Sequence, residues 1–516
     1  MLVTPSTHPV ARTPGVDPEG LRRSLWQFGT PPIELRETHG SWVFLTADRA
    51  FKLKKPLRFD FADLRDPESR RRACAEEANA NRVLAPGLEY ELRSVVPVGH
   101  GYSIAAADHP DAVDHVVVSR RFDESTTMAA HLGRGALVPE QAAAVGRRIA
   151  AFHRHARVVR AAPDARAVAD RNFQGLIPLA RGVVPSRDIL AARRFSEAFL
   201  LCWEDVLRGR AEAGRVVDGH GDLRAEHVLL DPEAPEGITI IDRLDHPRLR
   251  IVDVVDDLAF LCMDLEGSAA PAAAAAVLEG YVEGGGEPPP RELLAYFGAY
   301  RATVRAKVAL IRARQEQDPI GQEAEAVRLL GLARRLAARA RGEFVLLITG
   351  PPASGKSTLS DALGAATGLP VLRSDEVRHD VSDDYGLAGR TRVYAELGRR
   401  AGLERACIVD ATFGEPAIRQ AFFAELDSDH RRNVLAVECQ ARPQTLQHRA
   451  RVRVPGRWYG SEADAEVSAQ LARSFSPLDE LAPRDRLALN SEDEPERLMG
   501  AIESWLDGHL AAGRLS

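Results

Sequence analysis

The stretch Phe344–Thr358, FVLLITGPPASGKST, joins an apolar run to a glycine-rich loop. Its second part, Gly350 to Thr358, matches the pattern GxxxxGK[ST] in the strand-to-helix position that the pattern requires. Glycines let backbone N–H groups turn towards phosphate oxygens, and the following helix adds its positive N-terminal dipole. The sequence therefore predicts a phosphate-binding loop, with Lys356 at the β- and γ-phosphates of a nucleotide and the Ser357 hydroxyl on Mg²⁺. The residues expected to bind the nucleotide are Gly350, Ser354, Gly355, Lys356, Ser357 and Thr358.

Apolar runs and helical patterns alternate after this loop. The runs LPVL, ACIVD, NVLAVE and RLALN are each followed by a helical segment. Strands that are apolar on both faces and alternate with helices form a parallel sheet. We therefore predict an α/β domain over residues 341–516, with a parallel sheet flanked by helices.

Two acidic residues follow strands of this predicted domain. Asp375, in RSDEVR, is expected to accept a proton from an acceptor hydroxyl or to orient Mg²⁺ through water, with Arg378 binding an anionic or polar substrate. Asp410 ends the strand ACIVD, where a P-loop protein needs a second carboxylate to orient its metal ion. An aspartate that only caps a helix or a turn is the alternative at both positions.

The segment TLQHRARVR carries Arg449 and Arg453 four residues apart on one helix face. We interpret these arginines as a catalytic lid that closes over the transferring phosphoryl group and excludes water. A solvated basic helix would have the same pattern.

Together, GPPASGKST, RSDEVR, VDATF and the arginine-bearing helix resemble the small P-loop kinases related to zeta toxins, chloramphenicol phosphotransferase and gluconate kinases. The resemblance covers about Glu343–Ser516 and implies Asp375 on the acceptor side and Arg449 and Arg453 in the lid. Such kinases phosphorylate sugars, antibiotics, nucleotide sugars and polynucleotide ends, so the resemblance leaves the acceptor open.

The residues before 341 have a different organisation. Residues 1–25 carry Pro, Thr and Gly without periodicity and predict a loose arm. From 26 to about 124, short alternating runs surround one helical stretch, and from there to 340 the pattern is helical except near 218–256. This predicts an α+β domain over 26–340, with a small β lobe and a larger helical lobe that contains a hairpin.

The hairpin carries two aspartates, Asp222 in HGD and Asp242 at the end of ITII. Phosphoryl transfer needs a residue that orients the acceptor hydroxyl and ligands for the metal ion that bridges the phosphates. A pair of aspartates on one hairpin supplies both.

The small lobe adds a candidate lysine. In ADRAFKLKKP, Ala50, Lys52 and Lys54 share one face of a strand, and Lys52 fits best as the lysine aimed at the α- and β-phosphates. Its expected partner on the next helix is Glu77, with Glu76 as the neighbouring candidate.

The segment HGDLRAEH and the later aspartate resemble the catalytic loop HxDxxxxN and the metal-binding Asp of the aminoglycoside phosphotransferase and protein-kinase-like fold. The resemblance implies Asp222 as catalytic base and Asp242 as Mg²⁺ ligand, and it puts His227 where the family has a metal-binding Asn. Imidazole binds Mg²⁺ less well than an oxygen donor, so second-metal binding is in question. The resemblance covers about Pro32–Ala340 and implies a bilobal fold. The whole chain then looks like the bacterial bifunctional proteins that fuse such a phosphotransferase to a P-loop kinase.

Composition indicates an ordinary globular protein. The 516 residues are 45% hydrophobic and 28% charged, and the formal net charge of −6 argues against nucleic acid as a partner. The five cysteines are far apart and lack metal-like spacing, and no apolar run is long enough to span a membrane. We expect a cytoplasmic protein; the sequence does not indicate its oligomeric state.

The sequence thus predicts two kinase modules that use ATP and Mg²⁺ to phosphorylate hydroxyl groups of small molecules. Two alternatives remain open. In one, only the P-loop domain is catalytic and the kinase-like domain senses a nucleotide or another ligand. In the other, the P-loop domain is a polynucleotide 5′-hydroxyl kinase or a toxin-type kinase.

Overall fold

The computed structural model describes all residues except 1–15, 29–32, 39, 59–61, 162, 233, 235–236, 316–318, 383, 385, 428–432, 453–474, 477 and 516. The described chain forms two compact units, each built from segments that are separate in the sequence. The first unit comprises the residues up to Leu179, Val206–Pro290 and Arg301–Glu323. The second comprises Ala180–Asp205, Arg291–Tyr300 and the residues from Ala324. The second unit therefore contains the predicted domain 341–516 together with helical segments from the 26–340 region.

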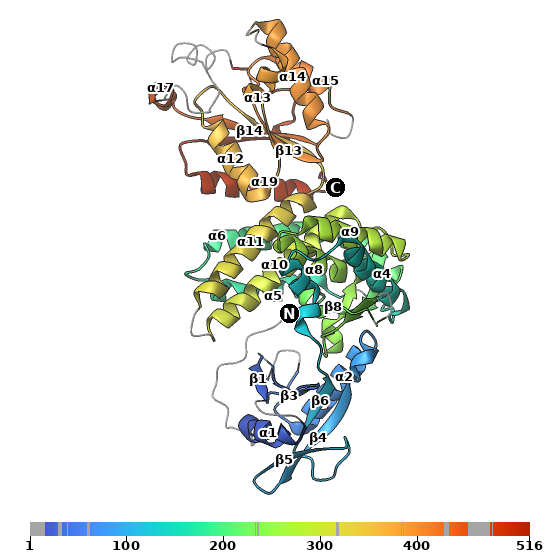
Figure 1. The fold of residues 1–516 in the computed structure, drawn as a ribbon. Helices are drawn as coiled ribbons and strands as arrows, with labels where there is room; N and C mark the ends of the chain where they lie inside the picture. Colours follow the sequence, from blue (N-terminus) through green and yellow to red (C-terminus); the bar gives the residue numbers. More distant parts are fainter. Residues whose placement is uncertain are drawn as a thin grey trace. The chain divides into compact units, whose positions relative to one another are not determined.

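The small lobe of the first unit is a six-stranded antiparallel sheet in the order β1-β2-β3-β6-β4-β5 (Figure 1). Its strands are β1 (Glu34–Glu37), β2 (Ser41–Leu45), β3 (Arg49–Lys54), β4 (Glu91–Val98), β5 (Gly101–Ala105) and β6 (Asp114–Arg120). The helix α2 (Pro67–Arg82) packs Cys74 and Ala78 against Val117 on β6. This lobe matches the predicted β lobe with one long helix.

A short helix begins earlier than the predicted arm allows. The helix α1 (Pro18–Ser24) starts at Asp17, whose carboxylate accepts hydrogen bonds from the backbone N–H groups of Glu19 and Gly20. An aspartate cap followed by proline is a strong helix start. Leu21 is buried in the core of the sheet, so the loose arm predicted for residues 1–25 does not extend through this segment.

The residues from 128 to 340 form a helical region with two short two-stranded sheets. The helices are α3 (Met128–Gly133), α4 (Pro139–His155), α5 (Ala165–Leu179), α6 (Ser186–Cys202), α7 (Glu204–Glu212), α8 (Val254–Gly267), α9 (Pro271–Glu283), α10 (Arg291–Ala313) and α11 (Ile320–Ala340). One sheet pairs β7 (Val216–Asp218) with β10 (Ile251–Asp253), and the other is the hairpin of β8 (Val228–Leu230) and β9 (Ile238–Ile240); both pairings are antiparallel. The predicted catalytic loop lies between β7 and β8. None of the helices in the described part of the chain has the length and apolar composition that a membrane crossing needs.

Helices α4 and α9 approach each other through glycines. A Cβ on Gly146 would lie 2.1 Å from the Val277 carbonyl oxygen, and one on Gly280 would lie 2.0 Å from that of Ala143. Only glycine permits this close contact between the two helices.

The P-loop sheet has five parallel strands in the order β12-β13-β11-β14-β15. The strands are β11 (Phe344–Thr349), β12 (Val371–Arg373), β13 (Ala406–Asp410), β14 (Val434–Gln440) and β15 (Arg486–Asn490). The helices of this region are α12 (Lys356–Thr367), α13 (Ser374–Val381), α14 (Leu387–Ala401), α15 (Pro416–Ala424), α17 (Pro443–Val452) and α19 (Pro495–Ala511). Val345 and Leu347 pack in one cluster with residues of α14 and α15, whereas Leu346 and Ile348 pack in another with residues of α12 and α19. Figure 1 shows these helices beside the sheet. The predicted parallel sheet with helices on both faces is confirmed.

Buried ion pairs join α6 and α11 to α19 within the second unit. Asp507 on α19 accepts a hydrogen bond at 3.0 Å from Arg194 on α6 and one at 2.6 Å from Arg341, just after α11. Glu503 pairs with Arg334 on α11 at 2.7 Å. Asp507 and Glu503 are nearly inaccessible to solvent, so these helices form part of the same core.

Candidate active sites

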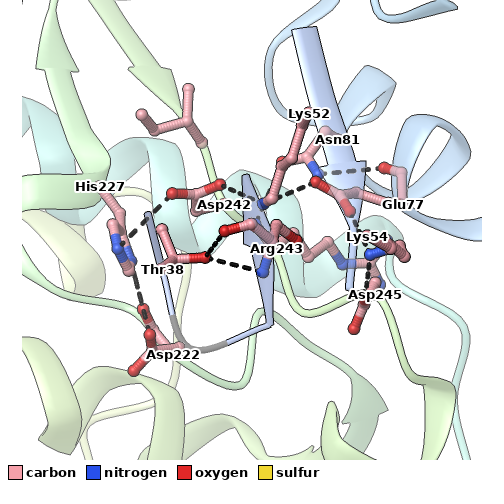
Figure 2. A network of polar contacts seen from close by, with 12 residues as sticks. Thr38, Lys52, Lys54, Glu77, Asn81, Asp222, His227, Asp242, Arg243 and Asp245 are labelled. Carbon is pink, nitrogen blue, oxygen red and sulfur yellow. Dashed lines mark hydrogen bonds and ion pairs between the residues drawn. The ribbon is translucent and has the colours of Figure 1, made fainter. Parts of the chain in front are cut away.

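The first site begins with a glutamate that holds two lysines. Lys52 and Lys54 lie on the same face of β3, and Glu77 comes from α2. The Lys52 Nζ lies 2.7 Å from Glu77 Oε1, and the Lys54 Nζ lies 2.6 Å from Glu77 Oε2 (Figure 2). Burial alone would raise the pKa of Glu77, but the two lysines hold it at about 2. The predicted partner of Lys52 is thus Glu77, while Glu76 pairs with Arg250.

Lys54 also belongs to this network, although the sequence pattern assigned it no role. Its ammonium group is almost fully buried and also bonds the Asp245 carboxylate at 2.6 Å. Strand alternation puts Lys54 beside Lys52, but the partner Asp245 comes from the loop after β9, far along the chain. Lys54 therefore ties the small lobe to the loop that follows Asp242.

Asp242 lies next to Lys52 in the same network. Their charged groups are 3.6 Å apart, and the charge of Lys52 lowers the pKa of Asp242. Asp242 has a φ of 55°, a left-handed conformation that is strained for a residue with a side chain. The preceding residue, Ile241, is fixed by its N–H, which donates to the His227 carbonyl at 2.9 Å.

Asp222 lies at the opposite end of the network. Both of its carboxylate oxygens accept hydrogen bonds from Arg224, each at 3.2 Å. Burial alone would raise the pKa of Asp222, but the positive charges of Arg224 and Arg305 hold it well below its ordinary value. Asp222 is therefore ionised and able to accept a hydrogen bond from a hydroxyl group.

The backbone of the catalytic loop is held by buried side chains. The Asp257 carboxylate on α8 accepts hydrogen bonds from the N–H groups of His220 at 2.6 Å and Gly221 at 2.7 Å. The His220 Nε2 donates to the Ile241 carbonyl at 2.8 Å, and its Nδ1 accepts from the Asp222 N–H at 3.2 Å. This tautomer is neutral, and burial lowers the pKa of His220 to about 4. The loop geometry is thereby set before any ligand binds.

His227 links the two aspartates. Its Nδ1 lies 2.7 Å from the Asp222 carbonyl oxygen, and its Nε2 lies 3.1 Å from Arg224. Figure 2 shows His227 between Asp222 and Asp242, with Nε2 4.0 Å from the Asp242 carboxylate. Because arginine can only donate, Nε2 accepts and Nδ1 carries the proton. The Nε2 lone pair that a metal ion would need is thus engaged by Arg224, and the metal-binding role of His227 stays a prediction.

The second site is the loop between β11 and α12. Gly350 has a φ of 138°, and a Cβ there would lie 2.6 Å from the Cys439 carbonyl oxygen. Gly355 has a φ of 90°, which also favours glycine. The Lys356 ammonium donates to the Pro351 carbonyl at 3.0 Å and so lies over the loop. Among the described residues, the buried Ser354 hydroxyl has no hydrogen-bond partner.

Asp410 faces the start of α12. It ends β13, is almost inaccessible to solvent and accepts a hydrogen bond from the Ser357 hydroxyl. Burial raises the pKa of Asp410, and the Lys356 charge and the Ser357 bond oppose the rise. The two oxygen-bearing groups predicted to serve Mg²⁺ are therefore adjacent.

Asp375 and Arg378 lie on the first turns of α13. Both charges act on the buried Tyr394, whose pKa burial raises to about 12. The Tyr394 hydroxyl accepts a hydrogen bond from the Phe413 N–H at 3.2 Å. The structure thus brings Asp375 and Arg378 together beside one tyrosine, which the sequence pattern did not single out.

Arg449 on α17 reaches the phosphate-binding loop. Its guanidinium donates to the Ser491 hydroxyl at 3.2 Å and to the Ser491 carbonyl at 3.0 Å. It also lies 3.4 Å from the position of a Cβ on Gly355. The second predicted lid residue, Arg453, lies outside the described residues.

The donor groups of both sites suit a nucleotide with Mg²⁺. No cluster of three or more His, Cys, Asp or Glu side chains in the described residues would hold a metal ion unaided. Magnesium needs no such cluster, because one or two carboxylates and substrate phosphates complete its coordination. Asp410 with Ser357, and Asp242 beside Lys52, supply oxygens of this kind. The unpartnered Ser354 hydroxyl and the glycines of the loop fit a phosphate group.

Fold and motifs together define a fusion of a protein-kinase-like domain with a P-loop kinase domain. A family model described as an AAA domain matches residues 345–478. The uncharacterized protein Rv2004c of Mycobacterium tuberculosis is 32% identical over 486 residues, covering 88% of this chain and 94% of the relative. The uncharacterized protein Mb2027c of Mycobacterium bovis matches to the same extent. The chain belongs to the same family as these mycobacterial proteins.

Solved structures resemble parts of the chain at low identity. A sugar kinase from Janibacter is 16% identical and covers 34% of this chain and 98% of its own, with a TM-score of 0.27. A choline/ethanolamine kinase family protein from Mesorhizobium loti is 18% identical and covers 59% and 93%, with a TM-score of 0.34. A putative aminoglycoside phosphotransferase from Ralstonia eutropha is 12% identical and covers 63% and 98%, also with a TM-score of 0.34.

Proposed function

We propose that the protein is a cytoplasmic phosphotransferase with two ATP- and Mg²⁺-dependent kinase modules that act on hydroxyl groups of small molecules. The observation that carries this proposal is the continuous set of contacts from Glu77 through Lys52 to Asp242, with His227 between Asp242 and Asp222. Lysine, glutamate and two aspartates are the groups that phosphoryl transfer needs. Sugars, antibiotics and nucleotide sugars are the candidate acceptors.

In the kinase-like module, Lys52 would bind the α- and β-phosphates while Glu77 holds its ammonium in position. Asp242 would hold Mg²⁺, and Asp222 would orient the acceptor hydroxyl and accept its proton. Bound ATP and Mg²⁺ would supply the phosphoryl group and neutralise its charge. The low pKa of Asp222 favours orientation of the hydroxyl over its full deprotonation.

In the P-loop module, the backbone of residues 350–355 and Lys356 would bind the phosphates, with Thr358 at the start of α12. Ser357 and Asp410 would hold Mg²⁺. Asp375 would accept the proton of the acceptor hydroxyl, and Arg378 would bind the acceptor. Arg449 would balance the charge of the transferring group, and Arg453 stays a predicted member of the same lid.

The test is transfer of labelled phosphate from ATP to a panel of sugars, aminoglycosides, nucleosides, nucleotide sugars and single-stranded oligonucleotides. Asp222→Asn should lower transfer by the kinase-like module about 10²- to 10⁴-fold. Lys356→Ala should remove transfer by the P-loop module. The matched control is Asp231→Asn, because that carboxylate follows β8 on the same hairpin and bonds Thr239.

Different acceptors lost in the two variants would support two active modules. If Asp222→Asn leaves all transfer intact, the kinase-like domain is a sensor and only the P-loop module is catalytic. Transfer to oligonucleotides that depends on Lys356 would instead make that module a polynucleotide 5′-hydroxyl kinase.

A further inference from the structure

A second arginine lies near Asp222 and has no part in the chemistry described above. Arg305 is on α10, one turn after Arg301, whose guanidinium donates to the Gly221 carbonyl at 3.0 Å. Residues four apart lie on the same helix face, so Arg305 also faces the catalytic loop. Its charge interacts with those of Arg224, Asp222 and Glu226.

The charged neighbours of Arg305 are already engaged with other groups. Arg224 pairs with Asp222 and with Glu226. Asp264, which also faces Arg305, accepts a hydrogen bond from the Ala225 N–H at 2.9 Å. Within the described part of the chain, Arg305 itself makes no hydrogen bond or ion pair.

The carboxylates of Asp222, Glu226 and Asp264 act on Arg305, but none of them makes an ion pair or a hydrogen bond with it in the described part of the chain. Arg305 is only partly accessible to solvent, and burial together with the like charge of Arg224 lowers its pKa more than Asp222, Glu226 and Asp264 raise it. A guanidinium group that is shielded from water and lacks an ion pair is unfavourable unless an anion reaches it. An anionic ligand group beside Asp222 would remove this cost.

We propose that the acceptor of the kinase-like module carries an anionic group, a phosphate or a carboxylate, which binds Arg305 while the acceptor hydroxyl faces Asp222. This inference rests on the proposed function and narrows its substrate class. The planar guanidinium group matches the oxygens of either anion in a bidentate manner. Polycationic aminoglycosides would be disfavoured, because their ammonium groups would meet Arg305 and Arg224.

The first test measures binding without turnover. Both nucleotide sites of the full chain are saturated with a non-hydrolysable ATP analogue and Mg²⁺, and inorganic phosphate is titrated by calorimetry. Wild type and the control Arg312→Gln, an exposed arginine on the same helix, should bind phosphate, and Arg305→Gln should weaken this binding at least about 10-fold. Absence of phosphate binding, or binding that survives Arg305→Gln, would overturn the inference and leave the proposed function untouched.

The second test compares acceptors that differ in charge. Sugar phosphates, hydroxy acids, the matching neutral sugars and alcohols, and aminoglycosides are assayed for transfer that Asp222→Asn abolishes. Arg305→Gln should raise KM for the anionic acceptors about 10-fold or more without changing KM for ATP, and Arg305→Lys should restore part of the loss. Preference for sugar phosphates or for hydroxy acids identifies the anion. A rise in KM for ATP, or selective turnover of aminoglycosides, would refute an acceptor-side anion site.

Discussion

The two candidate sites differ in how their polar groups are satisfied before a ligand binds. In the kinase-like site, Lys52, Lys54, Glu77 and Asp242 neutralise one another through ion pairs. In the P-loop, the Ser354 hydroxyl is buried without a partner among the described residues, and the loop is shaped by glycines in left-handed conformations. The first site is thus stabilised by its own functional groups, whereas the second carries an unsatisfied group that a phosphate can satisfy. Substitutions should therefore affect stability and activity differently in the two sites.

The largest expected effect separates the two lysines of the kinase-like site. Lys52→Met should lower Asp222-dependent transfer about 10²- to 10³-fold, because the phosphate-binding charge is lost, while transfer by the P-loop module is unchanged. Initial rates with each module's acceptor measure this. Lys55→Met, whose lysine pairs with the largely exposed Glu37, is the control and should retain both activities. Unchanged Asp222-dependent transfer in Lys52→Met would argue against Lys52 as the phosphate-binding lysine.

Lys54→Met should instead act on stability. Lys54 is nearly fully buried, and its removal leaves Asp245 without this partner and Glu77 with only Lys52. Breaking a buried ion pair of this kind costs about 3 kcal/mol of unfolding free energy. Urea denaturation of the full chain, followed by a probe in the small lobe, measures the change. The same Lys55→Met control should lower the unfolding free energy by less than Lys54→Met, because its partner Glu37 is largely exposed, and an equal loss in both variants would contradict the structural role of Lys54.

The buried His220 should make the kinase-like unit sensitive to mild acid. Because burial holds its folded-state pKa at about 4, below the ordinary 6.5, the unfolded chain binds a proton between these pH values that the folded chain does not. Neutral His220 therefore contributes fully to the unfolding free energy above pH 6.5. This contribution is lost as the pH falls, on the order of 2 kcal/mol between pH 7 and pH 5. The unfolding free energy, measured from denaturation curves at several pH values, should therefore depend more steeply on pH in wild type than in His220→Gln. Parallel pH profiles for the two proteins would rule out this role of His220.

The smallest expected effect is a gain in unfolding free energy, whereas the substitutions above lower activity or stability. Ser354→Ala removes a buried hydroxyl that has no partner among the described residues, so it should raise the unfolding free energy by up to about 1 kcal/mol while weakening ATP binding to the P-loop. Ser360 on α12 is also buried without a partner in the described chain. Ser360→Ala should give the same gain in stability with unchanged ATP binding. A loss of stability in Ser354→Ala would show that the hydroxyl contributes to the loop itself.

The sequence predicted the parts of the molecule that depend on neighbouring residues. GPPASGKST follows an apolar strand directly, and its position from the end of β11 into the first turn of α12 is confirmed. The order of Lys52, Glu77, Asp222 and Asp242 likewise predicted the groups that the structure brings together, although their roles stay predictions. Motif spacing sufficed here because each residue lies within a short, recognisable segment.

Contacts between distant segments could not be predicted in the same way. Lys54 and Asp245 are 191 residues apart, and nothing in either segment indicates the other. Arg305 reaches the catalytic loop from a helix with an ordinary amphipathic pattern. The short helix α1 was not predicted, because the proline and glycine residues around it indicated a loose arm although Leu21 is buried.

The ion pair between Arg194 and Asp507 also bears on how the protein is made. The two residues are separated by 313 positions, yet they pack in one unit. At a synthesis rate of 5 to 20 residues per second, α6 leaves the ribosome roughly 15 to 60 s before α19 exists. The second unit therefore completes its core only when translation of the chain is nearly finished, and a product that stops before α19 lacks the partner that Arg194 needs.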